Sequence, residues 1–397
     1  MVKTEQEPTP ATRHRLLPLV ALLLAAVNLR LAVTSVGPVL TEIRNGLGMS
    51  ATVAGLLTSV PVVCFASFGL LAPRFARRVG AARVILSGLC ALTLGLAARP
   101  YVPGTALFLL LSVVALAGIA VVNVLLPVVV KECFPTQVGS VTGLYTVALN
   151  VGATAAAATT VPLTSAFGGD WRLGLAAWAL VAVLAVPAWL PLARPAHVAA
   201  TPEVKDADYV RMGKNPVAWA LAVYFGMQST SAYVIIGWLP QIYRDAGISA
   251  EEAGVLFATT SFLGVPLGLG LSWLAGRLRT QSLIALILGL FGIAGYGGLW
   301  WDPAGAPWLW AILLGIVNTA FPLVLTMIAL RGSNPARVVR LSAFAQGVGY
   351  LVAIPGPILI GALHDWSGGW RAPLALMIFL MVPQIIAGMA AGRDRQV

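Results

Sequence analysis

Twelve apolar stretches, each about as long as a membrane-spanning helix, follow one another along this chain of 397 residues. A helix needs about 20 apolar residues to cross a bilayer core about 30 Å thick. The composition agrees, because 59% of the residues are hydrophobic, 10% are charged, and the mean hydropathy is +0.89. Strands of a membrane barrel would instead give short segments of alternating polarity. The sequence therefore predicts an all-α integral membrane protein with twelve transmembrane helices, at residues 16–40, 51–72, 81–99, 104–130, 136–166, 171–193, 216–243, 251–275, 281–301, 306–330, 337–363 and 370–391.

The net charge of +11 comes from basic residues that are scattered over the short hydrophilic gaps between these stretches. A nucleic-acid-binding protein gathers such residues into one tract or patch, so we expect no nucleic-acid partner. The three cysteines have no CxxC or paired spacing, and we expect neither a disulfide nor a metal site. His, Cys and acidic residues do not cluster at membrane depth, so we expect no catalytic residues, no cofactor and no enzymatic activity.

The twelve stretches divide into two sets of six, separated by the longest polar segment inside the chain. MSATVAGLL (49–57) matches ISAEEAGVL (248–256), and DWR (170–172) matches GWR (369–371), both at an offset of 199 residues. Matches in the same order at a nearly constant offset indicate a duplicated six-helix unit, which is typical of transporters. The sequence predicts two six-helix bundles within the following organisation: a tail at 1–15, a bundle at 16–193, a linker at 194–215, a bundle at 216–392 and a tail at 393–397.

The positive charges indicate which side of the membrane holds the termini, which an even number of spans places together. Of the 25 Lys and Arg residues, Arg30 lies within a span and five lie in loops on the side away from the termini, which leaves nineteen on the side of the termini. Short cytoplasmic loops carry an excess of Lys and Arg. We therefore expect a multi-pass protein of the cytoplasmic (inner) membrane with both termini and the linker inside the cell, and with Arg44, Arg99, Arg172, Arg244 and Arg371 outside.

A motif follows the second stretch. GLLAPRFARRVGAARVIL (69–86) resembles the loop motif G-x-L-a-D-R-x-G-R-R between the second and third helices of the major facilitator superfamily. Pro73 stands where the motif has an aspartate that helps to latch the cytoplasmic side in the superfamily, so this chain lacks the carboxylate of that latch. The resemblance implies the major facilitator fold, transport by alternating access, and a role in the conformational change for the residues that fit the motif, Gly69, Arg74, Arg77 and Arg78.

Within the superfamily, the chain is similar to the cyanate/2-nitroimidazole permease family. The similarity rests on four segments: NLRLAVTSVGPVLTEI (28–43), SVPVVCFASFGLLAPRFARRVG (59–80), GDWR (169–172) and GWLPQIYRDAGIS (237–249). This resemblance implies a carrier for a small polar molecule.

Arg30 lies near the centre of the first apolar stretch. An arginine there costs about 2.5–3.5 kcal/mol on insertion scales, so it faces a bundle interior or an aqueous cavity and marks a functional site by default. All 14 acidic residues lie in the termini, the loops or the helix ends of the predicted spans. Two interpretations of Arg30 follow. In the first, its guanidinium binds an anionic, nitro or carboxyl group of the substrate. In the second, Arg30 is a structural residue whose guanidinium donates to carbonyl groups of a neighbouring helix.

Uncharged polar residues accompany Arg30 in the predicted helices. Thr34 lies one turn from Arg30 on the same helix face, whereas Asn28 lies about 200° away in helical phase. For each of these residues an interhelical hydrogen bond is as good an explanation as a substrate contact. Together they predict a polar cavity with one fixed cation, whose substrate-binding residues are Arg30, Asn28, Thr34, Asn123, Asn150, Tyr224, Gln228, Trp238, Asn318, Gln346 and Tyr350.

We expect a secondary transporter that moves a small anion or a compact polar heteroaromatic molecule, cyanate-like or nitroimidazole-like. The alternative is an efflux carrier for larger amphipathic drugs, which predicts a mostly aromatic cavity. No membrane-embedded carboxylate is available to carry a proton, which favours uniport or substrate-linked charge movement over carboxylate-mediated antiport. Proton coupling through a protonated substrate or bound water is a further alternative. The expected partners are a small-molecule substrate and the lipid bilayer, and we expect a monomer.

Overall fold

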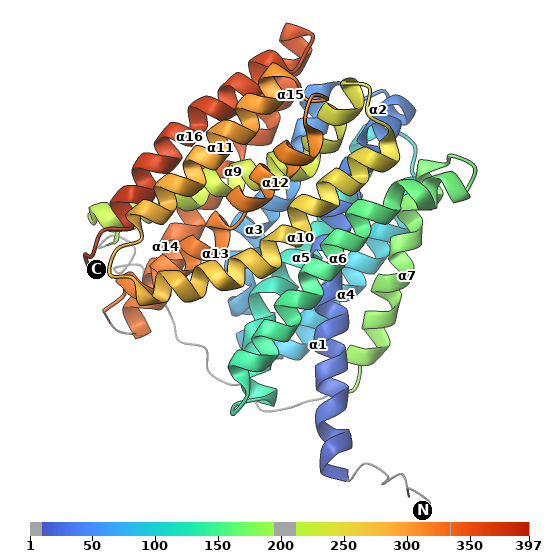
Figure 1. The fold of residues 1–397 in the computed structure, drawn as a ribbon. Helices are drawn as coiled ribbons and strands as arrows, with labels where there is room; N and C mark the ends of the chain where they lie inside the picture. Colours follow the sequence, from blue (N-terminus) through green and yellow to red (C-terminus); the bar gives the residue numbers. More distant parts are fainter. Residues whose placement is uncertain (1–9, 194–211, 334, 397) are drawn as a thin grey trace, which may run out of the picture.

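The computed structural model describes residues 10–193, 212–333 and 335–396, and most of them are helical (Figure 1). Twelve segments are long and apolar enough to cross a membrane, as predicted. The first half contains α1 (Pro10–Thr34), η1 (Gly37–Val39), α2 (Leu40–Leu47), α3 (Ala51–Val79), α4 (Ala81–Ala98), η2 (Arg99–Tyr101), α5 (Thr105–Cys133), α6 (Val138–Ala166) and α7 (Trp171–Trp189). The second half contains α9 (Pro216–Asp245), α10 (Ala250–Arg277), α11 (Ser282–Trp301), α12 (Pro307–Val317), α13 (Ala320–Arg331), α14 (Pro335–Ala353), α15 (Pro355–Ser367) and α16 (Arg371–Ala391).

The two halves form separate bundles that lie side by side, α1 to α7 in blue to green and α9 to α16 in yellow-green to red (Figure 1). Each half has its own apolar core, which contains Leu89 and Ile119 in the first half and Leu288 and Leu323 in the second. The all-α fold with two six-helix bundles is thus confirmed. Most of the predicted linker, at 194–215, falls outside the described residues, and the exact bundle boundaries stay a prediction.

Three of the twelve spans are interrupted helices: α1, η1 and α2 form the first, α12 and α13 the tenth, and α14 and α15 the eleventh. Each interruption lies next to a proline, Pro38, Pro322 or Pro355, which has no N–H for the helical hydrogen bond. Where α1 ends, the Val36 N–H donates to the Val33 carbonyl at 3.3 Å, one residue short of the helical partner. The apolar stretches themselves predicted continuous helices, because hydropathy does not register such breaks.

The molecule has two distinct ends. An even number of spans brings the start of α1 at Pro10 and the end of α16 at Ala391 to one end, which we call the terminal face. At the opposite end, which we call the closed face, the N-terminal parts of α3 and α10 pack against α15 and α6 of the other half. An apolar cluster there draws residues from both halves, among them Ile43, Leu57, Trp238 and Leu256.

The backbones of the two halves approach closely at two corresponding places on the closed face. A Cβ atom on Gly55 of α3 would overlap the Pro357 carbonyl oxygen of α15, and one on Gly254 of α10 would lie 3.0 Å from the Ala157 oxygen of α6. Gly254 follows Gly55 by the 199 residues of the sequence repeat. Small residues allow such close helix approach in a membrane bundle. The duplication therefore produces two equivalent contacts that join the halves at one end.

Polar bonds also join the halves at the closed face. The Arg244 side chain at the end of α9 donates two hydrogen bonds to the Glu42 carboxylate of α2, at 2.8 and 2.9 Å. The carboxylate of Asp365 on α15 accepts the backbone N–H groups of Ala51 and Thr52, at 3.0 and 2.7 Å, and thereby caps the first turn of α3. Within the described residues, the hydrogen bonds between the halves all lie on this side of the molecule.

Toward the terminal face the halves separate. A Cβ atom on Gly143 of α6, on Gly264 or Gly270 of α10, or on Gly347 of α14 would meet no atom within 4 Å. Two of these helices, α6 and α10, approach each other closely at the other end. The structure is therefore closed at one face and open between the halves toward the other.

Candidate functional site

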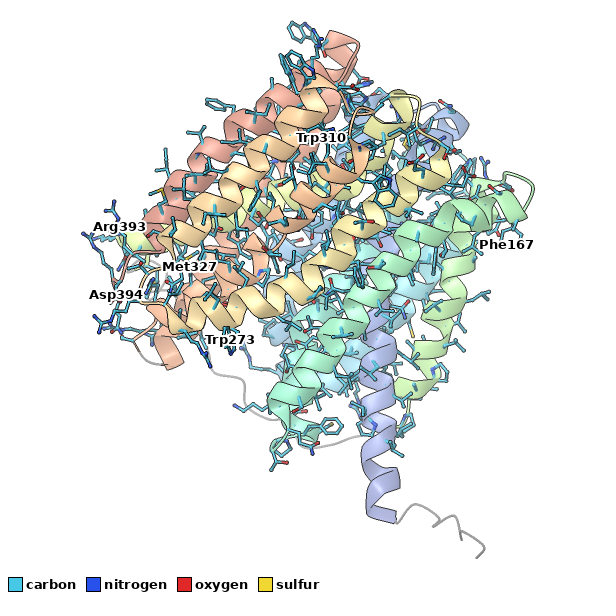
Figure 2. The ribbon with its side chains drawn as sticks, viewed as in Figure 1. Phe167, Trp273, Trp310, Met327, Arg393 and Asp394 are labelled. Atoms are coloured by element: carbon cyan, nitrogen blue, oxygen red, sulfur yellow. The ribbon has the colours of Figure 1, made fainter. Side chains whose placement is uncertain are left out.

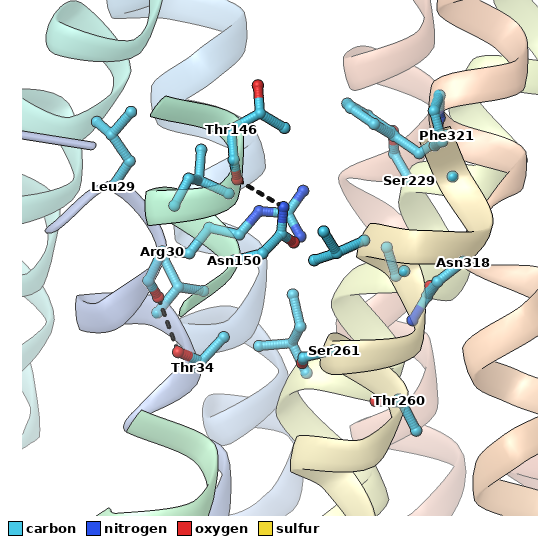
Figure 3. A pocket seen from close by; sticks show the side chains of 18 of the residues that line it. Leu29, Arg30, Thr34, Thr146, Asn150, Ser229, Thr260, Ser261, Asn318 and Phe321 are labelled. Carbon is cyan, nitrogen blue, oxygen red and sulfur yellow. Dashed lines mark hydrogen bonds between the residues drawn. The ribbon is translucent and has the colours of Figure 1, made fainter. Parts of the chain in front are cut away.

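A cavity of about 340 Å³ lies between the two halves. Helix α1 contributes one face of its central turns, with Arg30, Val33 and Thr34, and the second half contributes Ser229 and Tyr233 from α9. Figure 3 shows Arg30, Asn150 and Asn318 projecting into this space from helices of both halves. Further lining residues include Phe65, Asn123, Gly143, Thr146, Thr260, Ser261, Gly264, Phe321 and Tyr350.

Arg30 is half-buried in this cavity. Its backbone carbonyl accepts the Thr34 hydroxyl at 2.9 Å, as Figure 3 shows, but within the described part of the chain its guanidinium has no hydrogen-bond or ion-pair partner. A buried cation without a partner is unfavourable. The structural alternative, in which carbonyl groups of a neighbouring helix bind the guanidinium, is not seen among these residues.

The cavity wall supplies no negative charge. Among the described residues that line it there is no Asp or Glu, so the field of Arg30 is not neutralised at short range. A guanidinium presents its N–H donors in a planar fork, which matches the oxygens of carboxylate, nitro and similar groups. The cavity is therefore suited to a ligand that carries negative charge or strong acceptor atoms at one end.

Several uncharged polar groups face the same space without a partner. The side-chain carbonyl of Asn318 and the hydroxyl of Ser229 are buried and have no hydrogen-bond partner among the described residues. The Asn150 amide donates to the Thr146 carbonyl at 2.8 Å, as Figure 3 shows, which leaves its oxygen available as an acceptor. Buried polar groups are normally bonded, so these atoms are candidates for contacts with a ligand.

Aromatic rings form part of the wall. Phe65 of α3 and Tyr350 of α14 stack across the gap between the halves, with ring centroids 5.6 Å apart and planes at 15°. Phe225 of α9 meets Tyr350 edge to face at 5.0 Å. Tyr233 lines the cavity from α9. A planar apolar surface thus lies in the same cavity as the guanidinium, which suits a flat molecule with a polar end.

The structure brings together six of the eleven predicted substrate-binding residues. Five others do not line the cavity, and for all eleven the role in binding stays a prediction. The cavity is lined by Arg30, Thr34, Asn123, Asn150, Asn318 and Tyr350, and not by Asn28, Tyr224, Gln228, Trp238 and Gln346.

Helical phase explains two of the residues that lie elsewhere. Asn28 is fully buried on the opposite side of α1, where its amide donates to the carbonyls of Leu24 at 2.8 Å and Val181 at 3.3 Å. Gln228 points away from the cavity toward α16, where its carbonyl accepts the Gln384 amide at 2.9 Å. Both side chains therefore make interhelical hydrogen bonds, which was the alternative to a substrate contact.

The other three residues lie in different packing environments. Tyr224 belongs to the apolar core of the second half. Trp238 is fully buried near the closed face, where its indole Nε1–H donates to the Pro357 carbonyl oxygen at 3.4 Å. Gln346 donates to the Ser342 hydroxyl at 2.6 Å within its own helix.

Two cavity residues of α9, Ser229 and Tyr233, were not among the predicted ones. They follow Arg30 and Thr34 by 199 residues, the offset of the sequence repeat. The repeat therefore contained the signal for this face of α9, because duplicated helices present equivalent faces to a shared cavity.

The predicted loop motif is largely helical, because α3 continues through Val79. Gly69 is buried against Val124, whereas Arg74 and Arg78 are exposed and Arg77 is half-buried near the terminal face. In the part of the chain that the structure describes, none of these three arginines forms an ion pair. This agrees with the absence of the motif's aspartate at Pro73, and the conformational role of the motif stays a prediction.

Comparison with known proteins gives consistent results. Residues 22–354 match the family model of the Major Facilitator Superfamily. The chain is 33% identical over 387 residues to the 2-nitroimidazole transporter of Escherichia coli (strain K12), covering 97% of this chain and 98% of that protein. It is 33% identical over 369 residues to the cyanate transport protein CynX of the same organism, covering 93% and 95%. Among solved structures, a bacterial homologue of the human lysosomal transporter Spinster has a TM-score of 0.77 at 17% identity, covering 98% of this chain and 100% of that one.

Proposed function

The chain belongs to the Major Facilitator Superfamily, and from this premise we propose that it carries a small anion or a compact polar heteroaromatic molecule across the cytoplasmic membrane by alternating access. The observation that carries the proposal is the unpaired guanidinium of Arg30 in a cavity without a carboxylate. A substrate with an anionic or nitro group supplies the missing partner. A charge-assisted hydrogen bond of this kind is stronger in a desolvated cavity than in water.

The names of similar proteins support this substrate class. One is a 2-nitroimidazole transporter and another a cyanate transport protein. A cyanate ion and a nitroimidazole differ in size, but both present electron-rich acceptor atoms at one end of a flat or linear body. The forked donors of Arg30 and the rings of Phe65 and Tyr350 suit these two features.

We place the terminal face in the cytoplasm. The distribution of Lys and Arg supports this orientation, since most of them follow the helix ends on that side. The described structure then corresponds to a state that is open to the cytoplasm and closed to the outside. We keep the expectation of a monomer.

An efflux carrier for larger amphipathic drugs is the alternative. The cavity of about 340 Å³ lies at the small end of the usual range for ligand pockets, about 300–1,000 Å³. Its small volume, its single cation and the uncharged polar groups on its wall fit a compact polar ligand better than an extended amphipathic one.

The proposal is tested with purified protein. Cyanate, nitrate, 2-nitroimidazole and benzoate are screened for an increase in melting temperature, since a ligand that binds only the folded state stabilises it. Each stabilising compound is then followed in proteoliposomes as uptake above protein-free vesicles. If all four compounds leave the melting temperature unchanged while bulky cationic drugs raise it, the proposed substrate class is wrong.

A further inference from the structure

A second arginine, Arg99, is buried more deeply than Arg30. The topological count placed it in an outer loop, but η2 carries it into the interior of the first half, where only 1% of its surface is exposed. No Asp or Glu pairs with it among the described residues, and its Nε has no hydrogen-bond partner there. A buried charge without a counter-charge is unfavourable, so its presence needs an explanation.

One hydrogen bond of Arg99 has a local structural reason. Its Nη2 donates to the Ala32 carbonyl at 3.3 Å. This carbonyl is released where α1 ends, because the Val36 N–H donates to Val33 instead. A neutral donor of similar length would bind that carbonyl equally well, so the hydrogen bond does not explain the positive charge. The Arg99 Cζ also lies 5.9 Å from the centre of the Phe108 ring, at the outer limit of a cation–π contact. Neither contact engages Nε.

Although Arg99 lies inside the first half, its side chain reaches a small cavity that both halves enclose. This cavity has a volume of about 20 Å³, room for about one water molecule. Residues of both halves enclose this space: Thr58 and Gly37 belong to the first, and Ile236 and Gly237 to the second. Val33 and Ile236 line both this cavity and the large one, so these two residues lie between Arg99 and the space that holds Arg30.

The far side of the small cavity is closed by backbone contacts. A Cβ atom on Gly37 would overlap the Ile236 carbonyl oxygen, and one on Gly237 would overlap the Thr58 side chain. Both contacts join opposite halves. Parting of the halves at the closed face would separate these contacts and widen the small cavity toward that face, with the Arg99 side chain on its wall.

We propose that Arg99 is a second anion-binding residue, which binds a small monovalent anion when the closed face opens, whereas Arg30 binds it in the state described here. The inference rests on the proposed function. Arg30 and Arg99 lie on either side of Val33 and Ile236, so an anion has a favourable site in each of the two states. The conformational change transfers the anion from one arginine to the other.

The test uses nitrate, a small planar anion, as the probe and compares two states of the full chain. Gly361→Trp opens the closed face, because a side chain at Gly361 overlaps the Ala51 carbonyl oxygen of the other half and is remote from the small cavity. Nitrate affinity is measured by thermal shift at constant ionic strength, in the wild-type and Gly361→Trp backgrounds, each with Arg99→Gln or Arg30→Gln. Arg99→Gln removes the positive charge and keeps an N–H donor near the position of Nε.

In the Gly361→Trp background we expect Arg99→Gln to weaken nitrate binding at least tenfold and Arg30→Gln to weaken it less. In the wild-type background the order reverses. Unchanged nitrate affinity of Arg99→Gln in the open background, or no nitrate binding there at all, overturns the proposal and leaves Arg99 a structural residue. A third outcome separates the two proposals. If nitrate binding depends on Arg99 in the open background and the wild type does not bind nitrate, the Arg99 site is supported and the proposed role of Arg30 is contradicted.

Two substitutions keep the test decisive if a variant does not fold. If Arg99→Gln does not fold, Arg99→Lys, which preserves the charge, is used in its place. A several-fold loss of nitrate affinity confined to the open background supports the proposal, and equal losses in both backgrounds contradict it. The double variant Glu42→Gln/Asp365→Asn removes polar bonds across the closed face and replaces Gly361→Trp.

Discussion

A guanidinium differs from an ammonium in geometry as well as in charge, and substitution of Arg30 separates the two properties. A hydrogen bond to a charged group contributes about 1.5–3 kcal/mol, so Arg30→Ala should weaken substrate binding about ten- to hundredfold. Arg30→Lys keeps the charge without the planar fork and should lose part of the affinity. Binding is measured by thermal shift and transport in proteoliposomes. An unchanged melting temperature without ligand is the control, and near-normal uptake by Arg30→Ala would remove Arg30 from the site.

Two asparagines of the first half provide a matched comparison of cavity and packing roles. Asn150 faces the cavity, whereas Asn28 bonds two backbone carbonyls away from it. We expect Asn150→Ala to weaken substrate binding severalfold with little change in melting temperature. Asn28→Ala should lower the melting temperature, because it removes the hydrogen bond to Val181 of α7, and an interhelical hydrogen bond contributes about 0.6–1.7 kcal/mol in membrane proteins; it should leave affinity nearly unchanged. The reverse pattern would show that the cavity face of α1 and α6 is assigned incorrectly.

At the scale of the helices, the first turn of α3 depends on a carboxylate from the other half. Asp365 accepts the Ala51 and Thr52 N–H groups and the Thr52 hydroxyl, the last at 2.7 Å. An acidic cap at a helix N-terminus contributes about 0.5–2 kcal/mol. Here that free energy stabilises the closed face as well as the helix, because cap and helix belong to opposite halves. The bond is therefore specific to one conformational state.

Asp365→Asn replaces one accepting oxygen by an NH₂ group, so at least one of these bonds is lost and the open state of this face should gain population about two- to tenfold. The population is measured as the distance distribution between spin labels at Asn45 and Ala304, which are exposed on opposite halves. Asp170→Asn is the matched control, since Asp170 caps α7 within one half through the Arg172 N–H at 2.8 Å. If both variants shift the distribution equally, Asp365 does not hold the face closed.

At the scale of the whole molecule, hydropathy and the repeat were sufficient to predict twelve spans, two bundles and a cavity containing Arg30, because a charge inside an apolar stretch must face protein or water. Hydropathy could not place Arg99, which ends an apolar stretch before Pro100 and so has the sequence appearance of a loop residue. Its burial arises from the packing of η2 against α5 and α7, which no local pattern records. Likewise, which face of α9 met the cavity depended on the repeat rather than on polarity, since Gln228 and Ser229 are adjacent and point differently.

The opening between the halves predicts which positions a membrane-impermeant maleimide reaches. In a background in which Cys64, Cys90 and Cys133 are replaced by serine, a cysteine at Gly143 or Gly264 should react rapidly in inside-out vesicles, because both positions face open space on the cavity wall. A cysteine at Thr58, which is 8% exposed between the cavity and the closed face, should react slowly from either side. A bound substrate should slow labelling at Gly143 and Gly264. Rapid labelling of these two positions only from outside intact cells would reverse the proposed orientation, and equal labelling of all three would contradict a face held closed by contacts between the halves.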